Sequence, residues 1–239
     1  MIVFKPLSHI RAISFDLDET LYDNMPYIHK AQQSLNDYMH TNYPQTKSIS
    51  AEQWRNIRQR VLFEQPQLKN DLGGLRKTVL TIGFMQTNMH SDKIETAVEQ
   101  CFDYFYMKRS DFEVPKSVRK VLKKLASKVP LAAITNGNVD LVAIGIDTYF
   151  SCIVHASQAH PMKPNPAMFD YVSKQLDIPP KNILHVGDDL DKDVRGAIDA
   201  GYQAAWFAVN RTMDLTKEPV SMLPHIQLHE LKTLKKLLK

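Results

Sequence analysis

Two carboxylates stand one residue apart, at Asp16 and Asp18, directly after a short apolar segment that contains Ile13 and Phe15. The apolar residues predict a buried strand that ends near Asp16, and residues i and i+2 of a strand face the same way. Both carboxylates would therefore enter one small volume, where they repel each other unless a cation or a proton neutralises them. Mg²⁺, a hard cation that prefers oxygen ligands, would fit such a pair. By itself the pattern also suits a turn, so the rest of the chain decides its meaning.

Further polar groups follow predicted strands later in the chain. Thr135 and Asn136 come directly after one apolar strand. Asp188 follows another after a single glycine, Gly187, and Lys163 lies in the loop that follows a third. In open parallel sheets, ligands bind outside the carboxyl ends of the strands. These groups are therefore expected to meet Asp16 at one edge of a sheet.

The order of the predicted elements indicates the fold class. From residue 114 onward, short strands alternate with helices, a pattern that gives a parallel sheet with helices on both faces. Residues 22–113 show only helical periodicity, which predicts a bundle of four helices. We therefore predict an α/β protein with a parallel-sheet core, residues 1–21 and 114–239, and an inserted all-helical cap, residues 22–113. Beyond the cap, the predicted strands are 130–134, 152–154, 183–186 and 204–207, and the predicted helices are 115–128, 139–144, one from 165, 194–200 and 228–238.

The predicted constellation suits the transfer of a phosphoryl group. Asp16 would attack phosphorus and form an aspartyl-phosphate. Asp18 would protonate the leaving alcohol and then deprotonate the attacking water. Catalysis of such a transfer rests mainly on positioning and on neutralising the charge of the phosphoryl oxygens. Thr135 and the backbone amide of Asn136 would bind those oxygens, and Lys163 would neutralise both the nucleophile and the phosphate.

Mg²⁺ is the expected cofactor. It would bridge Asp16 and a phosphoryl oxygen, and Asp188 would supply a further ligand. Asp189 and Asp193 lie where the chain enters the next predicted helix. Either could support the site from a second layer, Asp193 by orienting Lys163, or could serve the start of the helix on local grounds. Both interpretations of these two residues stay open.

Four motifs, in order, resemble those of the haloacid dehalogenase superfamily of phosphatases. They are FDLDETL at 15–21, TNG at 135–137, KP at 163–164 and GDDLDKD at 187–193. The resemblance implies a Rossmann-like core with a helical cap of the C1 type inserted between the first two motifs. It also implies that Asp18 binds the metal through its backbone carbonyl.

Further segments resemble one bacterial branch of that superfamily, which dephosphorylates FMN and 5-amino-6-(5-phosphoribitylamino)uracil in riboflavin biosynthesis. The segments are TLYDN at 20–24, AITNGN at 133–138, ILHVGDDL at 183–190, QAAW at 203–206 and LPH at 223–225. The cap matches this branch less clearly than the core does. The resemblance therefore implies the reaction more firmly than the substrate.

The composition limits the kinds of binding partner and the location that we expect. The chain has 239 residues, of which 44% are hydrophobic and 23% charged, as in an ordinary globular protein. A formal net charge of +4 could attract an anionic substrate. The sequence has no basic run interleaved with aromatic residues, so we do not expect it to bind nucleic acid. Cys101 and Cys152 have no motif spacing, which favours a reducing compartment. No signal peptide and no membrane helix are predicted. We expect a cytoplasmic enzyme that acts on a small phosphorylated metabolite, without an obligate protein partner.

Other uses of the same residues remain open. A general sugar-phosphate or nucleotide phosphatase, or a phosphomutase, would employ the same groups. A dehalogenase would use the Asp16 nucleophile on carbon without a metal, and it would have no use for Asp18 as an acid or for Asp188 as a ligand. A binding protein without turnover would not need the intact pair of Asp16 and Asp18.

Overall fold

The computed structural model describes residues 1–238, and the chain divides into two compact units. We call the first the core unit; it comprises Met1–Asn24, Glu113–Gly137 and the chain from Ile144 onward. We call the second the helical unit; it comprises Met25–Phe112 and a short second segment, Asn138–Ala143. The sequence-based boundaries assigned residues 138–143 to the core, so the helical unit draws on a piece of chain that the pattern did not indicate.

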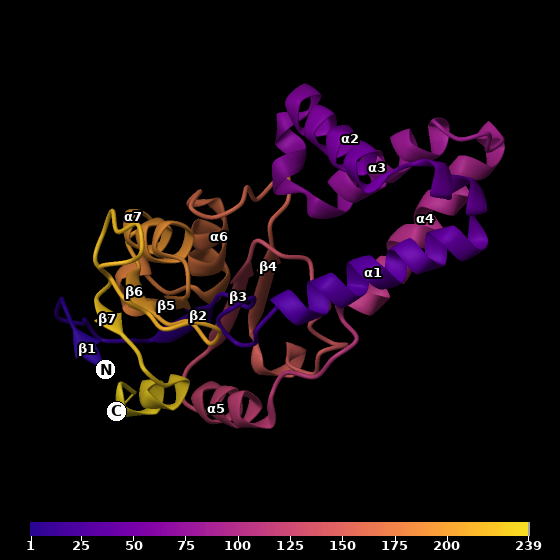
Figure 1. The fold of residues 1–239 in the computed structure, drawn as a ribbon. Coiled ribbons are helices and arrows are strands. Elements are labelled where there is room, and N and C mark those ends of the chain that lie inside the picture. The colour runs from indigo at the N-terminus through magenta and orange to yellow at the C-terminus, as the bar shows by residue number, and fades with distance from the viewer. Residues whose placement is uncertain (239) are drawn as a thin grey trace. The chain divides into compact units, whose positions relative to one another are not determined.

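A seven-stranded sheet forms the centre of the core unit (Figure 1), with the strand order β1-β7-β6-β5-β2-β3-β4. All neighbouring pairs are parallel except β1 with β7. Every residue of β2, β3, β5 and β6 is buried, as expected for parallel strands covered on both faces. The predicted α/β class is confirmed. The strands are β1 (Ile2–Val3), β2 (Ala12–Phe15), β3 (Leu131–Thr135), β4 (Cys152–His155), β5 (Ile183–Gly187), β6 (Gln203–Trp206) and β7 (Ile226–Gln227).

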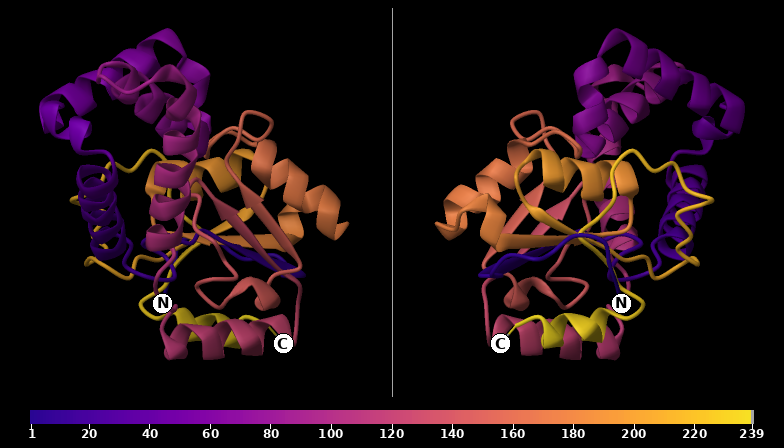
Figure 2. Two further views of the ribbon diagram at one scale, coloured as in Figure 1. Left: turned by 90° about the vertical axis from the view of Figure 1, so that its right-hand side faces the viewer. Right: turned by 90° about the vertical axis from the view of Figure 1, so that its left-hand side faces the viewer.

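Helices cover both faces of this sheet (Figure 2). On one face, α6 (Ala167–Leu176), the π-helix η5 (Leu190–Arg195) and α7 (Gly196–Asp199) pack on the strands, where Phe169 and Trp206 are buried. On the other face, α5 (Lys116–Ala126) lies beside the short 3₁₀ helix η6 (Leu231–Lys236). Two more 3₁₀ turns, η3 (Asp147–Tyr149) and η4 (Pro180–Asn182), complete the unit.

Two predicted helices are not α-helices in the structure. Instead of a helix at 139–144, the structure has turns at 141–145, where the Asp140 carboxylate accepts hydrogen bonds from the amides of Val142 (2.9 Å) and Ala143 (3.3 Å) and so replaces helical bonding. The predicted helix at 228–238 shortens to η6, in which Leu231 and Leu234 are buried at the i, i+3 spacing of a 3₁₀ helix.

Four α-helices build the helical unit: α1 (Met25–Asn42), α2 (Ala51–Glu64), α3 (Leu72–Met85) and α4 (Ser91–Arg109). Ser50 and Gln53 form a capping box at the start of α2, with reciprocal hydrogen bonds of 3.2 and 2.7 Å. Helix α4 begins at Ser91, and His90 is its N-cap. The 3₁₀ turns η1 (Pro44–Ser48) and η2 (Pro66–Asn70) join the helices. None of the helices in residues 1–238 combines the length and the apolar character that a membrane crossing requires.

Candidate active site

The strand register brings the predicted site residues to one edge of the sheet. Phe15 at the end of β2 pairs with Val186 of β5 and with Ala133 of β3. Asp16, which follows β2, donates its backbone N–H to the carbonyl of Val186 at 2.9 Å. Asp16 is therefore level with Ile134 and Gly187, and Thr135 and Asp188 lie one residue further along, so all three stand at the same edge of the sheet.

Lys163 is the centre of the site's charge network. Its side chain is buried, and Nζ contacts Asp16 Oδ1 at 2.6 Å, Asp193 Oδ1 at 2.7 Å and the carbonyl oxygen of Ile134 at 2.7 Å. These three acceptors match the three donors of an ammonium group. Burial alone would lower the pKa of Lys163, but Asp16 and Asp193 raise it above its ordinary value, so the lysine is charged.

Asn136 holds the backbone of Lys163. The Asn136 side chain donates from Nδ2 to the Lys163 carbonyl at 3.1 Å and accepts at Oδ1 from the Lys163 amide at 2.8 Å. This pair of bonds fixes the loop residue against the end of β3, 27 residues earlier. The sequence suggested a use for the backbone amide of Asn136, and the structure gives its side chain a positioning task as well.

Asp193 links Lys163 to the interior of the sheet. Its Oδ1 contacts His185 Nε2 at 3.3 Å, and His185 Nδ1 contacts the Ser14 hydroxyl at 2.9 Å. Its Oδ2 accepts from the Asp189 amide at 3.0 Å. Burial would raise the pKa of Asp193, but Lys163 and His185 lower it below its ordinary value. Asp193 is therefore an ionised partner of Lys163, which agrees with the orienting role considered from the sequence.

Two glycines make room for these carboxylates. A Cβ atom on Gly187 would stand 2.2 Å from Cγ of Asp193, and one on Gly137 would stand 2.7 Å from Oδ2 of Asp18. Real Cβ contacts essentially never fall below 3.0 Å. A side chain at position 187 would therefore displace Asp193 as a whole, whereas one at position 137 would displace only the end of the Asp18 side chain.

Hydrogen bonds within the first loop orient its polar groups. Asp18 Oδ1 accepts from the Tyr22 hydroxyl at 2.6 Å, and Asp16 Oδ2 accepts from the Thr20 hydroxyl at 3.3 Å. The Thr135 hydroxyl accepts from the amide of Gly137 at 3.0 Å. Thr20 and Tyr22 are site residues that the sequence did not single out, although both belong to the segment TLYDN at 20–24.

Asp188 carries an unpredicted partner, Arg211. The guanidinium donates to Asp188 Oδ2 at 2.8 Å and to the Asp188 carbonyl at 2.7 Å. It also donates two hydrogen bonds of 3.1 Å to the carboxylate of Glu218. Trp206 Nε1 also donates to the Asp188 carbonyl, at 2.7 Å. Burial and Asp193 nevertheless raise the pKa of Asp188 to about 6. Arg211 lies in a loop without periodicity, so no sequence signal pointed to it.

Asp189 serves the local backbone. Its Oδ1 accepts from the amides of Asp191 (2.9 Å) and Lys192 (2.8 Å), and its Oδ2 pairs with Lys192 Nζ at 2.7 Å. These contacts cap the helix η5. Of the two interpretations drawn from the sequence, the structure favours the helix start for this residue.

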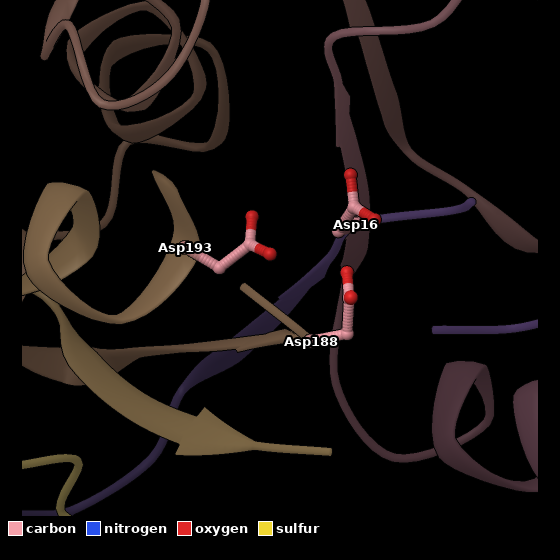
Figure 3. Close-up of side chains that lie close together, drawn as sticks. All are labelled: Asp16, Asp188 and Asp193. Atoms are coloured by element: carbon pink, nitrogen blue, oxygen red, sulfur yellow. The ribbon is translucent and has the colours of Figure 1, made fainter. Parts of the chain in front are cut away.

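Three carboxylates could hold a metal ion (Figure 3). Oxygens of Asp16, Asp188 and Asp193 lie within 4.8 Å of one another, and the carboxylates of Asp188 and Asp193 point toward Asp16. The group consists of hard oxygen donors, which suits Mg²⁺. Lys163 and His185 lower the pKa of Asp193 below its ordinary value, whereas burial raises the pKa values of Asp16 and Asp188 above theirs. The site therefore fits a divalent cation. Asp16 and Asp188 are the carboxylates whose negative charge such a cation would stabilise.

Comparison with known proteins identifies the class. The family model described as haloacid dehalogenase-like hydrolase matches residues 10–201. With this match and the geometry above, the chain belongs to the haloacid dehalogenase-like hydrolases. The resemblance recognised from the motifs is confirmed.

Individual relatives refine this assignment. The chain is 32% identical to 5-amino-6-(5-phospho-D-ribitylamino)uracil phosphatase YigB of Escherichia coli, over 98% of this chain and 99% of that protein. It is 24% identical to the human N-acylneuraminate-9-phosphatase, over 92% and 90% of the two chains. The crystal structure of a 2-haloacid dehalogenase from Pseudomonas syringae pv. Tomato superimposes with a TM-score of 0.89 at 30% identity, covering 96% and 98%. Family and relatives together support phosphatase activity, as the sequence predicts.

Proposed function

We propose that this protein is a Mg²⁺-dependent phosphomonoesterase that works through an aspartyl-phosphate on Asp16. The observation that carries the proposal is the position of Asp16 Oδ1, 2.6 Å from the buried ammonium of Lys163, at the sheet edge that also holds Asp18 and Asp188. A carboxylate nucleophile needs a neighbouring positive charge both to remain ionised and to receive a dianionic phosphate.

The reaction has two steps. An oxygen of Asp16 forms a bond to phosphorus while the ester P–O bond breaks, and Asp18 gives its proton to the departing alkoxide. Water then attacks the same phosphorus, Asp18 takes the water's proton, and Asp16 leaves as a carboxylate. Tyr22, which donates to Asp18 Oδ1, holds that carboxyl group in one orientation. The Thr135 hydroxyl would donate to a phosphoryl oxygen, and Lys163, whose three donors are already used, would act on the phosphoryl oxygens through its charge.

Asp16 and Asp188 would hold the magnesium ion, together with the backbone carbonyl of Asp18. When bound, the ion supplies positive charge to the phosphoryl oxygens and to the nucleophile. Asp193 and Asn136 act on Lys163 rather than on the ion, Asp193 through its 2.7 Å contact with Nζ.

The substrate proposed first is 5-amino-6-(5-phosphoribitylamino)uracil, with FMN second. The support is the 32% identity to the Escherichia coli phosphatase that is named for the first compound. The helical unit, residues 25–112 with 138–143, would act as the cap that selects the organic part of the substrate. A cytoplasmic location is part of the same proposal, since both cysteines are free.

Asp16→Asn is the decisive variant. It should lower phosphate release from any ester to background, because an amide cannot form the aspartyl-phosphate. Asp103→Asn, an exposed change on α4, is the matched control and should retain full turnover. Substantial turnover by Asp16→Asn would remove Asp16 as the nucleophile.

Metal and substrate are tested separately. EDTA should stop phosphate release and Mg²⁺ should restore it, so full activity in excess chelator would refute the metal requirement. A phosphate-release screen over flavin, ribitylamino-pyrimidine, nucleotide and sugar phosphates should rank the first two highest. Indifference to both would leave a phosphatase with another substrate, or a phosphomutase if a sugar phosphate accepts the phosphoryl group.

A dehalogenase is the second candidate, because the crystal structure that superimposes with a TM-score of 0.89 is described as a 2-haloacid dehalogenase. Its nucleophile would be the same Asp16 acting on carbon. Halide release from 2-chloropropionate in EDTA tests it directly. Release at a rate above that of phosphate would favour this candidate over the phosphatase.

A further inference from the structure

The helical unit contains a cavity of about 460 Å³ between α1, α2 and α3. The volume lies within the range of small-molecule sites. Each helix contributes one face, and on α2 this face consists of Ala51, Trp54, Arg55 and Arg58, at the spacing i, i+3, i+4, i+7. None of the residues of the helical unit that line the cavity is an acid. All of the residues that line it belong to the helical unit, whereas Asp16 belongs to the core unit, so the cavity is distinct from the candidate active site.

The cavity wall is apolar on most sides and cationic on one. Trp54, Phe105 and Met39 join leucines of α1 and α3 to form the apolar part. The cationic part consists of Arg55, Arg58 and Arg76. Arg55 and Arg58 are exposed and Arg76 is partly buried, whereas the buried face of α2 consists of Ile57 and Val61, as expected for an amphipathic helix.

Most of the hydrogen-bond donors of Arg76 have no acceptor among the described residues. Its guanidinium stacks on the Phe105 ring, with Cζ 3.4 Å from the centroid, and donates one hydrogen bond, to Gln32 Oε1 at 3.1 Å. Gln32 is fixed in this orientation because its Nε2 donates to Asn36 Oδ1 at 3.0 Å. Only one of the five N–H donors of Arg76 is thus used within residues 1–238.

Charge in the cavity is unbalanced. Burial, with a contribution from Arg58, lowers the pKa of Arg76 to about 10. In the described part of the chain, none of Arg55, Arg58 and Arg76 has a carboxylate within 4.0 Å, whereas Arg60 on the outer face of α2 pairs with Glu64. A desolvated guanidinium without an anion is costly, and bidentate binding of a carboxylate or phosphate would offset that cost.

We propose that this cavity is a binding site for a small organic anion with a planar apolar body, held by Arg58 and Arg76 at its charged end and by Trp54 and Phe105 along its body. The site goes beyond the proposed phosphatase activity, because none of the predicted catalytic or metal-binding residues lines it. The anionic group could be a carboxylate or a phosphate, since a guanidinium fork accepts both.

The probe for the test is 8-anilinonaphthalene-1-sulfonate, a planar anion whose fluorescence rises in apolar sites, and its neutral counterpart is N-phenyl-1-naphthylamine. We expect the anion to bind the full-length protein with a stoichiometry of one. Arg58→Gln and Arg76→Gln should each weaken it about tenfold, as loss of a charge-assisted pair predicts. Arg60→Gln is the matched control and should change the affinity less than about twofold. The neutral probe should bind all three variants with unchanged affinity.

Three outcomes overturn the proposal: no saturable binding, equal affinities of Arg58→Gln and Arg60→Gln, or equal losses for the neutral and the anionic probe. Arg58 is exposed, so its variant informs the test even where Arg76→Gln does not fold. Displacement of the probe from Asp16→Asn by 1-naphthoate and by 1-naphthyl phosphate distinguishes a carboxylate ligand from a phosphate.

A kinetic experiment distinguishes the two possible sources of the ligand. If the cavity receives the organic part of the phosphatase substrate, the probe should raise KM for a phosphate ester and leave kcat unchanged. If it receives a separate metabolite, saturating probe should leave KM unchanged. Because the binding titrations need no turnover, failure of the phosphatase proposal would not affect them.

Discussion

The core unit and the helical unit each hold a cation away from water, Lys163 fully and Arg76 only partly, and the two cations have opposite surroundings. Lys163 has three acceptors at 2.6–2.7 Å, two of them carboxylates, so its hydrogen-bonding capacity is used up inside the protein. Arg76 has one amide acceptor and an aromatic ring. A cation whose partners are all internal can hold neighbouring groups in place, whereas a cation with unused donors can receive a ligand.

Replacing Lys163 should have the largest effect. Lys163→Met leaves Asp16 and Asp193 buried without their cation, which typically costs about 3–5 kcal/mol of unfolding free energy. Phosphate release should fall by at least about 100-fold, since an electrostatic contact to the reacting group is lost. Urea denaturation and steady-state assays measure the two effects. Lys192→Met, at a lysine whose side chain is 53% exposed and pairs with Asp189, should cost less than about 1 kcal/mol.

Gly187→Ala tests how much the contact between Lys163 and Asp193 contributes to stability and turnover. The new methyl group would collide with Asp193, 2.2 Å away, and must push it from Lys163. We expect a loss of about 1–3 kcal/mol and reduced turnover. Gly73→Ala, where the nearest atom would be 3.5 Å away and the residue is helical, should instead be neutral or slightly stabilising. Equal effects of the two variants in denaturant melts would contradict the steric argument.

Asp16→Asn should sharpen the comparison by leaving Lys163 with one carboxylate. Burial raises the pKa of Asp16 well above its ordinary value. A raised folded-state pKa contributes stability that is present at low pH and is lost as the pH rises. In EDTA at pH 8 the variant should therefore exceed the wild type by about 1 kcal/mol, and the advantage should shrink toward pH 4. Urea melts at both pH values decide this, and an advantage that grows on acidification would be inconsistent with it.

Arg76→Met should have the smallest effect on stability and the opposite sign to Lys163→Met. Replacing a desolvated, unpaired charge by an apolar side chain is neutral or stabilising, here within about 1 kcal/mol. Thermal unfolding measures it, with Arg60→Met on the outer face of α2 as the control. A loss of several kcal/mol would show that Arg76 is a structural cation like Lys163, and the comparison would fail.

The sequence predicted the sheet edge well because strand ends and polar residues coincide along the chain. Asp16, Thr135 and Asp188 each follow or end an apolar strand, so local pattern and sheet register give the same answer. Ser14 and His185 could have been found as polar residues at paired positions of two apolar strands.

Other parts of the site depend on contacts that no local pattern encodes. Arg211 reaches Asp188 from 23 residues away, through a loop. The strands β1 and β7 have two residues each, too few for a periodicity to register. The roles of the arginines on α2 became visible only once α1 and α3 had been placed beside them.

The short segment Asn138–Ala143 has a consequence for how this protein can change over time. Because it belongs to the helical unit, the chain passes between the two units four times, after residues 24, 112, 137 and 143. Exchange of residues 25–112 with a related gene would leave this segment behind, facing a foreign partner. Recombination in one step would thus break up the helical unit, whereas stepwise substitution within the existing helices keeps both of its segments together. An engineered chimera would need both segments from the same parent.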